Sequence, residues 1–93
     1  MTPHSRVERD IIALLTSCGW FAFESHSPTA RPAHPGIPDI LAVKEGRLLC
    51  VEVKVPPDKL SATQVDVIES LHHAGARVIV ARSVADVEDV ARR

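Results

Sequence analysis

Two carboxylates stand on neighbouring segments where they could bind a metal ion. Residues 39–44 and 47–55 are apolar, β-branched stretches joined by a Glu-Gly pair, which is a hairpin signal. A two-residue turn places Asp39 directly opposite Glu52, on one face and with Cβ atoms roughly 4.5–5.5 Å apart. Like charges at that distance repel, so we expect a divalent cation such as Mg²⁺ to compensate for them.

Strand alternation puts Lys54 on the same face as Glu52, two positions further on. A metal ion held by Asp39 and Glu52, with the Val53 carbonyl as a further ligand, would activate water. Lys54 would then orient the nucleophile or stabilise charge on a phosphate. Two alternatives stay open: a three-residue turn that shifts the register, or a solvated strand face preceded by a post-proline turn.

The elements that position these residues follow from hydrophobic spacing. A helix is predicted from Arg6 to Cys18, opened by Thr2-Pro3 or by Ser5 with Glu8, because apolar residues recur at helical intervals. A strand is predicted at residues 20–24. The proline-rich loop that follows, to residue 38, is either a substrate or partner contact or a disordered insertion.

After the hairpin, a helix opening at Ser61 is expected to bury Val65, Ile68 and Leu71. Residues 77–81 read as a buried strand, and Ser83 as the cap of a last helix whose apolar side carries Val84, Val87, Val90 and Ala91. The order α-β-β-β-α-β-α predicts an α/β fold with a mixed four-stranded sheet, because the helix between the last two strands makes a parallel crossover.

Length and composition agree with one domain spanning residues 1–93. The chain has 93 residues, of which 45% are hydrophobic, and a homodimer would add buried apolar area. Cys18 and Cys50 read as free thiols, and no leader or membrane span is evident, so we expect a cytoplasmic protein of a bacterial or phage-infected cell. The net charge of −1 argues against a generic nucleic-acid coat but not against a nuclease.

Three short motifs, GIPD, CVEVK and SATQ, resemble the PD-(D/E)xK nuclease superfamily and, within it, the VRR-Nuc (virus-type replication and repair nuclease) family. The resemblance implies a restriction-endonuclease-like core, metal ligation by Asp39 and Glu52, and Lys54 as the catalytic lysine. It also implies roles for Gln64 and Glu8 and a requirement for Mg²⁺ or Mn²⁺. Stand-alone members are expected to be homodimers that cut branched DNA, such as four-way (Holliday) junctions.

Glu8 and Gln64 also have a structural interpretation, because each stands three residues after a serine at a helix start, where a capping box forms. His72-His73 is interpreted as a surface pair, and His26 and His34 as loop residues that could touch substrate but have no metal role. Arg31 and Lys59 flank the site in sequence and are the preferred phosphate contacts.

Three functions compete. The leading hypothesis is a structure-selective, metal-dependent DNA endonuclease. The first alternative is a non-catalytic DNA-binding or assembly module of the same fold, which the intact Asp39, Glu52 and Lys54 disfavour. The second is a restriction-type or RNA-processing nuclease, and the short chain leaves little room for the separate recognition domain that a restriction enzyme needs.

Overall fold

The computed structural model describes residues 1–26 and 34–93 and has the predicted order of elements. These are α1 (Pro3–Ser17), β1 (Phe21–Glu24), β2 (Ile40–Lys44), β3 (Arg47–Val53), α2 (Ala62–His73), β4 (Arg77–Ala81) and α3 (Ala85–Ala91). The strands form one sheet in the order β1-β2-β3-β4, antiparallel except for the parallel pair β3 and β4. The fold prediction is therefore confirmed.

The hairpin has the two-residue turn that the site prediction requires. Glu45 and Gly46 both adopt positive φ angles, of 52° and 76°, as a type I′ turn demands. Lys44 pairs with Arg47 and Ile40 with Val51, so the register continues to Asp39 opposite Glu52. The three-residue alternative is wrong.

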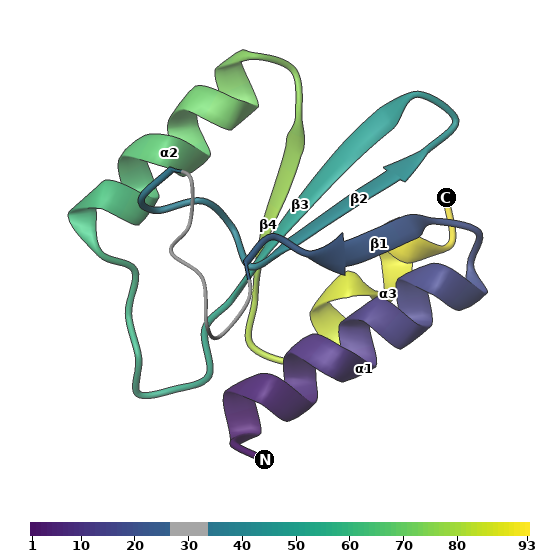
Figure 1. Cartoon of the computed structure of the whole chain (residues 1–93), viewed down its shortest axis with the longest axis horizontal. Helices are drawn as coiled ribbons and strands as arrows, with labels where there is room; N and C mark the ends of the chain where they lie inside the picture. The colour runs from purple at the N-terminus through teal and green to yellow at the C-terminus, as the bar shows by residue number, and fades with distance from the viewer. Residues whose placement is uncertain (27–33) are drawn as a thin grey trace.

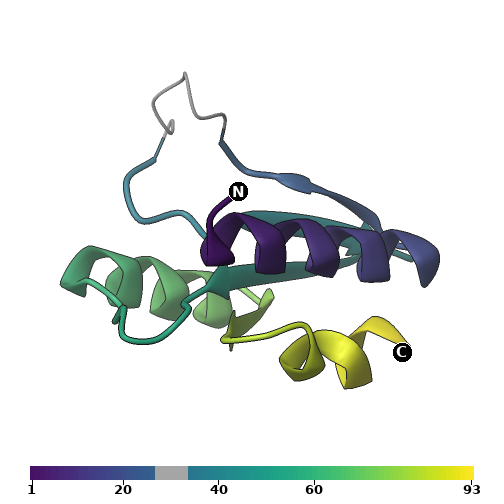
Figure 2. The same cartoon turned by 90° about the horizontal axis from the view of Figure 1, so that it is seen from below.

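The two faces of the sheet are covered differently. Figure 1 shows α2 on one side of the sheet and α1 with α3 on the other, and Figure 2 shows the same layers from below. The α1 and α3 side carries the hydrophobic core, which includes Ile11, Leu15, Ile40, Ala42, Leu49, Val51, Val53, Val87 and Val90. The core is formed by alternate residues of β2 and β3, because successive side chains of a strand point to opposite faces.

Several predicted details need correction. Helix α1 begins at Pro3 rather than Arg6: of its two predicted openings Thr2-Pro3 is right, since the Thr2 hydroxyl accepts a hydrogen bond from the Ser5 N–H (3.0 Å) and caps the helix. Ser83 does not cap α3, whose N-terminal flanking residue is Val84; instead the Asp86 carboxylate accepts from the Arg82 N–H.

The apolar face predicted for α2 is also only partly right. Val65 is 38% exposed, and no residue of α2 is fully buried, because this helix covers just one margin of the sheet. Strand β4 is not a buried strand either: it lies at the sheet edge, and Val80 is 40% exposed. None of the described helices has the length and hydrophobicity needed to cross a bilayer.

Candidate active site

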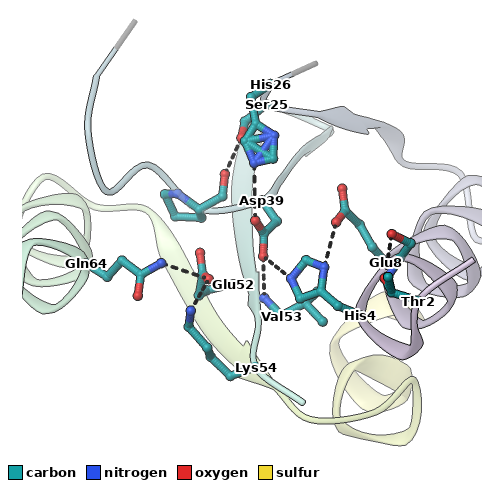
Figure 3. A network of polar contacts seen from close by, with 12 residues as sticks. Thr2, His4, Glu8, Ser25, His26, Asp39, Glu52, Val53, Lys54 and Gln64 are labelled. Carbon is teal, nitrogen blue, oxygen red and sulfur yellow. Dashed lines mark hydrogen bonds and ion pairs between the residues drawn. The ribbon is translucent and has the colours of Figure 1, made fainter. Parts of the chain in front are cut away.

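Three carboxylates gather where β2 begins and β3 ends, between α1 and α2 (Figure 3). Glu8, Asp39 and Glu52 are 6%, 7% and 2% exposed, and among the residues that the structure describes they are the buried charged side chains. Burying carboxylates is costly unless partners or a cation compensate for their charge. The concentration of such residues at one end of the sheet marks the candidate site.

Asp39 is fixed by its neighbours through both its backbone and its side chain. Its carbonyl accepts from the Ser25 N–H (2.8 Å), and the Ser25 hydroxyl donates to the Pro38 carbonyl. Its Oδ2 accepts from the Val53 N–H (2.9 Å). Asp39 is thereby held against the end of β3, beside Glu52, as the register predicts.

Gly36 in the GIPD segment packs this approach to Asp39 against α2. Its φ is +79°, and a Cβ added there would lie 2.9 Å from the Thr63 carbonyl oxygen. Only glycine combines this backbone conformation with so close an approach. The glycine of the motif therefore sets the distance between the loop before Asp39 and the helix that carries Gln64.

Glu52 is contacted by the two predicted residues on its side of the site. Lys54 Nζ lies 3.6 Å from Glu52 Oε2, and Gln64 Nε2 lies 3.3 Å from the same oxygen. The other oxygen, Oε1, is buried and has no hydrogen-bond partner among the described residues. A solvated strand face, the structural alternative for this segment, is excluded by the burial of Glu52.

Gln64 forms the predicted capping box and also contacts Glu52. It completes a capping box with Ser61, because its Oε1 accepts from the Ser61 N–H while the Ser61 hydroxyl accepts from the Gln64 N–H. Its amide nitrogen remains free to face Glu52. Glu8, in contrast, is in no capping box, since α1 is capped by Thr2, three residues before the Ser5 cap that a box with Glu8 would require.

Two of the carboxyls resist ionisation. Burial, reinforced by the charges of Asp39 and Glu24, raises the pKa of Glu8 to about 7. Burial and the charge of Asp39 likewise raise the pKa of Glu52 to about 7, although Lys54 opposes that shift. Negative charge in the site is therefore under-compensated by the protein alone.

The residues fit a divalent cation. Carboxylate oxygens are ligands that Mg²⁺ and Mn²⁺ prefer, and Oε1 of Glu52 supplies one that no described residue satisfies. His4, Glu8 and Asp39 form a further group whose potential ligand atoms all lie within 4.8 Å of one another.

The sequence patterns did not indicate His4, and they indicated His26 only as a loop residue that could touch substrate. His4 Nδ1 lies 3.5 Å from Glu8 Oε2, and His4 Nε2 lies 3.3 Å from Asp39 Oδ2. His26 Nε2 lies 3.5 Å from Asp39 Oδ1. The four-residue spacing between His4 and Glu8 places both on one helix face and was a usable signal.

The remaining candidates are less informative. Lys59 is exposed on the connection between β3 and α2, and Arg31 lies outside the described residues. His72 and His73 are exposed in the last turn of α2, as a surface pair should be. Cys18 and Cys50 are free thiols, as expected.

Comparisons with known proteins agree with the geometry. The family model of the VRR-NUC domain matches residues 4–85. Among solved structures, one described as a VRR-NUC domain is similar with a TM-score of 0.77 and 26% identity, over 97% of this chain and 95% of that chain. Archaeoglobus fulgidus Hjc, a Holliday junction resolvase from an archaeal hyperthermophile, is similar with a TM-score of 0.61 and 30% identity, over 82% of this chain and 64% of that chain. A search of curated proteins found no match.

Proposed function

Because this chain belongs to the VRR-NUC domain family of nucleases, we propose that it hydrolyses DNA phosphodiester bonds at the site formed by Asp39, Glu52 and Lys54. The observation that carries the proposal is Glu52 Oε1, which is buried and has no partner within residues 1–26 and 34–93, next to Asp39 and with Lys54 on its companion oxygen. A non-catalytic module would have no use for an unsatisfied carboxylate in this position, whose burial costs stability.

Asp39 and Glu52 would hold Mg²⁺ or Mn²⁺, with the Val53 carbonyl as a further ligand and Glu8 close enough to assist. When bound, the ion supplies Lewis-acid polarisation of a phosphate oxygen and lowers the pKa of water. The Val53 N–H keeps Asp39 turned toward β3, so that one ligand is positioned by the backbone of the strand that carries the other.

Lys54 and Gln64 act on the other side of Glu52. The Lys54 ammonium lies 3.6 Å from Glu52 Oε2. Among the described residues it is the lysine or arginine group that contacts a carboxylate of the site. There it orients the attacking water or stabilises charge that develops on the phosphate. Gln64 donates to the same oxygen and holds the Glu52 carboxylate in one orientation.

For the substrate, we propose branched DNA such as a four-way junction. The support is the likeness to Archaeoglobus fulgidus Hjc, whose description is a Holliday junction resolvase. Lys59, exposed on the connection between β3 and α2, and Arg31 are the proposed phosphate contacts.

We also propose that the chain is a homodimer, because one sheet face of the described structure carries a row of exposed apolar side chains. Phe21, Val43 and Leu48 are neighbours across β1, β2 and β3 and are 72%, 42% and 39% exposed. Phe23 extends this row, with its ring centroid 5.5 Å from that of Phe21. Contiguous exposed apolar side chains of this kind mark association surfaces, and a two-fold dimer would present two sites to a junction.

The test is cleavage of labelled four-way junction, flap, linear duplex and single-stranded DNA in Mg²⁺, Mn²⁺ or EDTA, with Asp39→Asn as the inactive control. We expect metal-dependent cutting with the junction preferred. Equal cutting of all forms would retain the nuclease and reject the branched substrate. Binding without cutting in either metal would favour the non-catalytic module, and cutting of a labelled RNA assayed in parallel, with no DNA cut, would favour the RNA-processing alternative.

A further inference from the structure

We propose that a cavity at the end of the sheet opposite the carboxylates binds a nucleoside phosphate, with its base on Arg47 and its phosphate held by Arg77. The cavity has a volume of about 610 Å³ and lies where β3 and β4 begin, beside the C-terminal ends of α2 and α3. About 17 Å of extended strand separates Arg47 from Glu52 near the other end of β3. This ligand site is therefore separate from the proposed metal site and does not depend on it.

The cavity has the size and the walls of a small-molecule site. Ligand pockets usually enclose roughly 300–1,000 Å³ and combine apolar walls with a few polar groups. Gly46 and Gly75 line the cavity, and a Cβ added to either would meet nothing within 4 Å, so the two turns leave space at its rim. The apolar walls include Trp20, Leu49, Leu71 and Val90.

The charged side chains that line the cavity are all arginines. They are Arg47, Arg77 and Arg93, and no described aspartate or glutamate lies among the lining residues. This is a local excess, because the whole chain has 12 acidic residues and 11 lysines and arginines. Lys44 adds to it from β2, where it pairs directly with Arg47, and like charges so placed repel. An anion in the cavity would relieve that repulsion.

Neighbouring groups engage two of these arginines. Arg93 pairs with Asp89 at 2.6 Å. Arg47 lies 3.7 Å from Glu45 and donates to the Arg93 carbonyl oxygen at 3.1 Å, so the end of α3 explains part of the cluster structurally.

Arg77 has no such explanation. It is exposed at the start of β4 and makes no ion pair or side-chain hydrogen bond with any other described residue. A guanidinium whose donors are unused, at the rim of a cavity, is suited to bidentate recognition of a phosphate. We therefore assign the phosphate to Arg77.

Arg47 supplies a flat surface for the base. Its guanidinium carbon lies 5.2 Å from the centre of the Trp20 ring, which positions the group, while its side chain remains 45% exposed. Nucleic-acid-binding proteins stack bases on arginine planes in the same way. Arg77 is the cross-strand neighbour of Leu49, two positions beyond Arg47, so the two arginines start from nearby positions on one sheet face. One ligand can therefore contact both.

This chemistry has two possible sources, a free mononucleotide and a nucleotide of an unpaired DNA strand. The chain has one tryptophan, Trp20, and it lines the cavity, so its fluorescence reports binding. Titrations in EDTA, which prevents metal-dependent cleavage, compare deoxyadenosine 5′-monophosphate, deoxyadenosine, inorganic phosphate and single-stranded oligo(dA), with calorimetry as a second readout. We expect the mononucleotide to bind more tightly than deoxyadenosine or phosphate. Tighter binding of the single strand would identify the strand as the source, and binding of the mononucleotide alone would identify the free nucleotide.

Substitutions locate the ligand. Arg77→Ala should weaken binding of the mononucleotide at least about 10-fold, because it removes charge-assisted hydrogen bonds to the phosphate. Arg82→Ala, at an exposed arginine directly after β4, is the matched control and should bind like wild type. Arg47→Lys keeps the charge but not the flat surface, so it should lose the preference for the mononucleotide over inorganic phosphate. Lys54→Ala should bind like wild type.

The proposal is overturned if wild type fails to bind the mononucleotide at millimolar concentration, or if deoxyadenosine or inorganic phosphate binds equally well. Equal binding by Arg77→Ala and Arg82→Ala would also overturn it, and so would loss of binding in Lys54→Ala, which would place the nucleotide in the catalytic site. Cleavage is assayed separately. A protein that binds the nucleotide and cuts no DNA would keep this site and reject the nuclease, whereas a nuclease that binds no nucleotide would do the reverse.

Discussion

The Gln64 amide nitrogen lies 3.3 Å from Glu52 Oε2, while the amide oxygen of the same side chain accepts from the Ser61 N–H. One side chain therefore ends the loop before α2 and orients a carboxylate at the end of β3. The capping box fixes the Gln64 side chain on the first turn of α2. Its amide N–H can therefore donate to Glu52 without further ordering of the side chain.

Two substitutions at Gln64 separate these roles. Gln64→Glu keeps the capping box, because glutamate is equally suited to that position, but replaces the donor with a carboxylate facing Glu52. We expect a melting temperature in Mg²⁺ close to that of wild type and cleavage reduced at least about 10-fold, the effect of roughly 1.4 kcal/mol on the barrier. Gln64→Ala should lose both the capping box and the contact with Glu52. We expect it to cut more slowly and to lose about 1 kcal/mol of stability, because the helix cap is gone. Wild-type cleavage by Gln64→Glu would show that the contact with Glu52 is incidental.

Metal-free protein should lose stability as the pH rises. The pKa values of Glu8 and Glu52 are about 7 in the folded chain, against 4.5 for an ordinary glutamate. The folded state therefore holds protons that the unfolded chain releases between these values, and this contribution to stability disappears as the pH rises through 7. Melting in EDTA between pH 5 and pH 8 should show a fall of several degrees, since 1 kcal/mol corresponds to roughly 4–8 °C in a domain of this size.

Two controls belong to that measurement. Glu8→Gln removes one of the two groups and should flatten the decline in EDTA. Saturating Mn²⁺ should also flatten it, because a bound cation favours the ionised carboxylates. A melting temperature that rises steadily with pH in EDTA would contradict the placement of these carboxyls.

Gly36→Ala should reduce both stability and cleavage, because it disturbs the packing of the loop before Asp39 against α2. A positive φ costs an alanine about 1–2 kcal/mol, and the new Cβ would press on the Thr63 carbonyl at 2.9 Å. Gly46→Ala is the matched control, since Gly46 has a similar φ of +76° and nothing within 4 Å of an added Cβ. Thermal unfolding should show the larger loss for Gly36→Ala, and cleavage should fall in that variant alone. Equal losses would mean that the contact with Thr63 is unimportant.

Phe21→Asp should convert the proposed dimer into a monomer. Phe21 is the most exposed member of the apolar row on the open sheet face, and a carboxylate there would be desolvated on association. Light scattering after size exclusion measures the mass directly. Val65→Asp, at an equally apolar but separate site on α2 that is 38% exposed, should leave the mass unchanged. A monomeric wild type would reject the dimer. A dimer that persists in Phe21→Asp would place the interface elsewhere.

The site could largely be predicted because it depends on local rules. A Glu-Gly turn sets the register, and the register brings Asp39 to Glu52. What could not be predicted depends on tertiary packing. Val65 has the spacing of a core residue, yet α2 lies over a sheet margin and leaves it exposed. His4 joins the site because α1 begins at Pro3, three residues earlier than its apolar pattern indicates. The sequence allowed either Thr2 or Ser5 as the cap of this helix, and the pattern alone could not decide between them.

The most direct test of the nuclease assignment is the single-turnover cleavage rate of Lys54→Ala beside Lys59→Ala, on a four-way junction in Mn²⁺, with binding measured in parallel. Lys54 contacts Glu52 in the site, whereas Lys59 is exposed outside it. We expect Lys54→Ala to bind the junction and to cut it at least about 100-fold more slowly, the loss typical of removing one electrostatic stabiliser. Lys59→Ala should weaken binding and keep most of the cleavage rate. Undiminished cleavage by Lys54→Ala would contradict the assignment of Asp39, Glu52 and Lys54 as the catalytic centre.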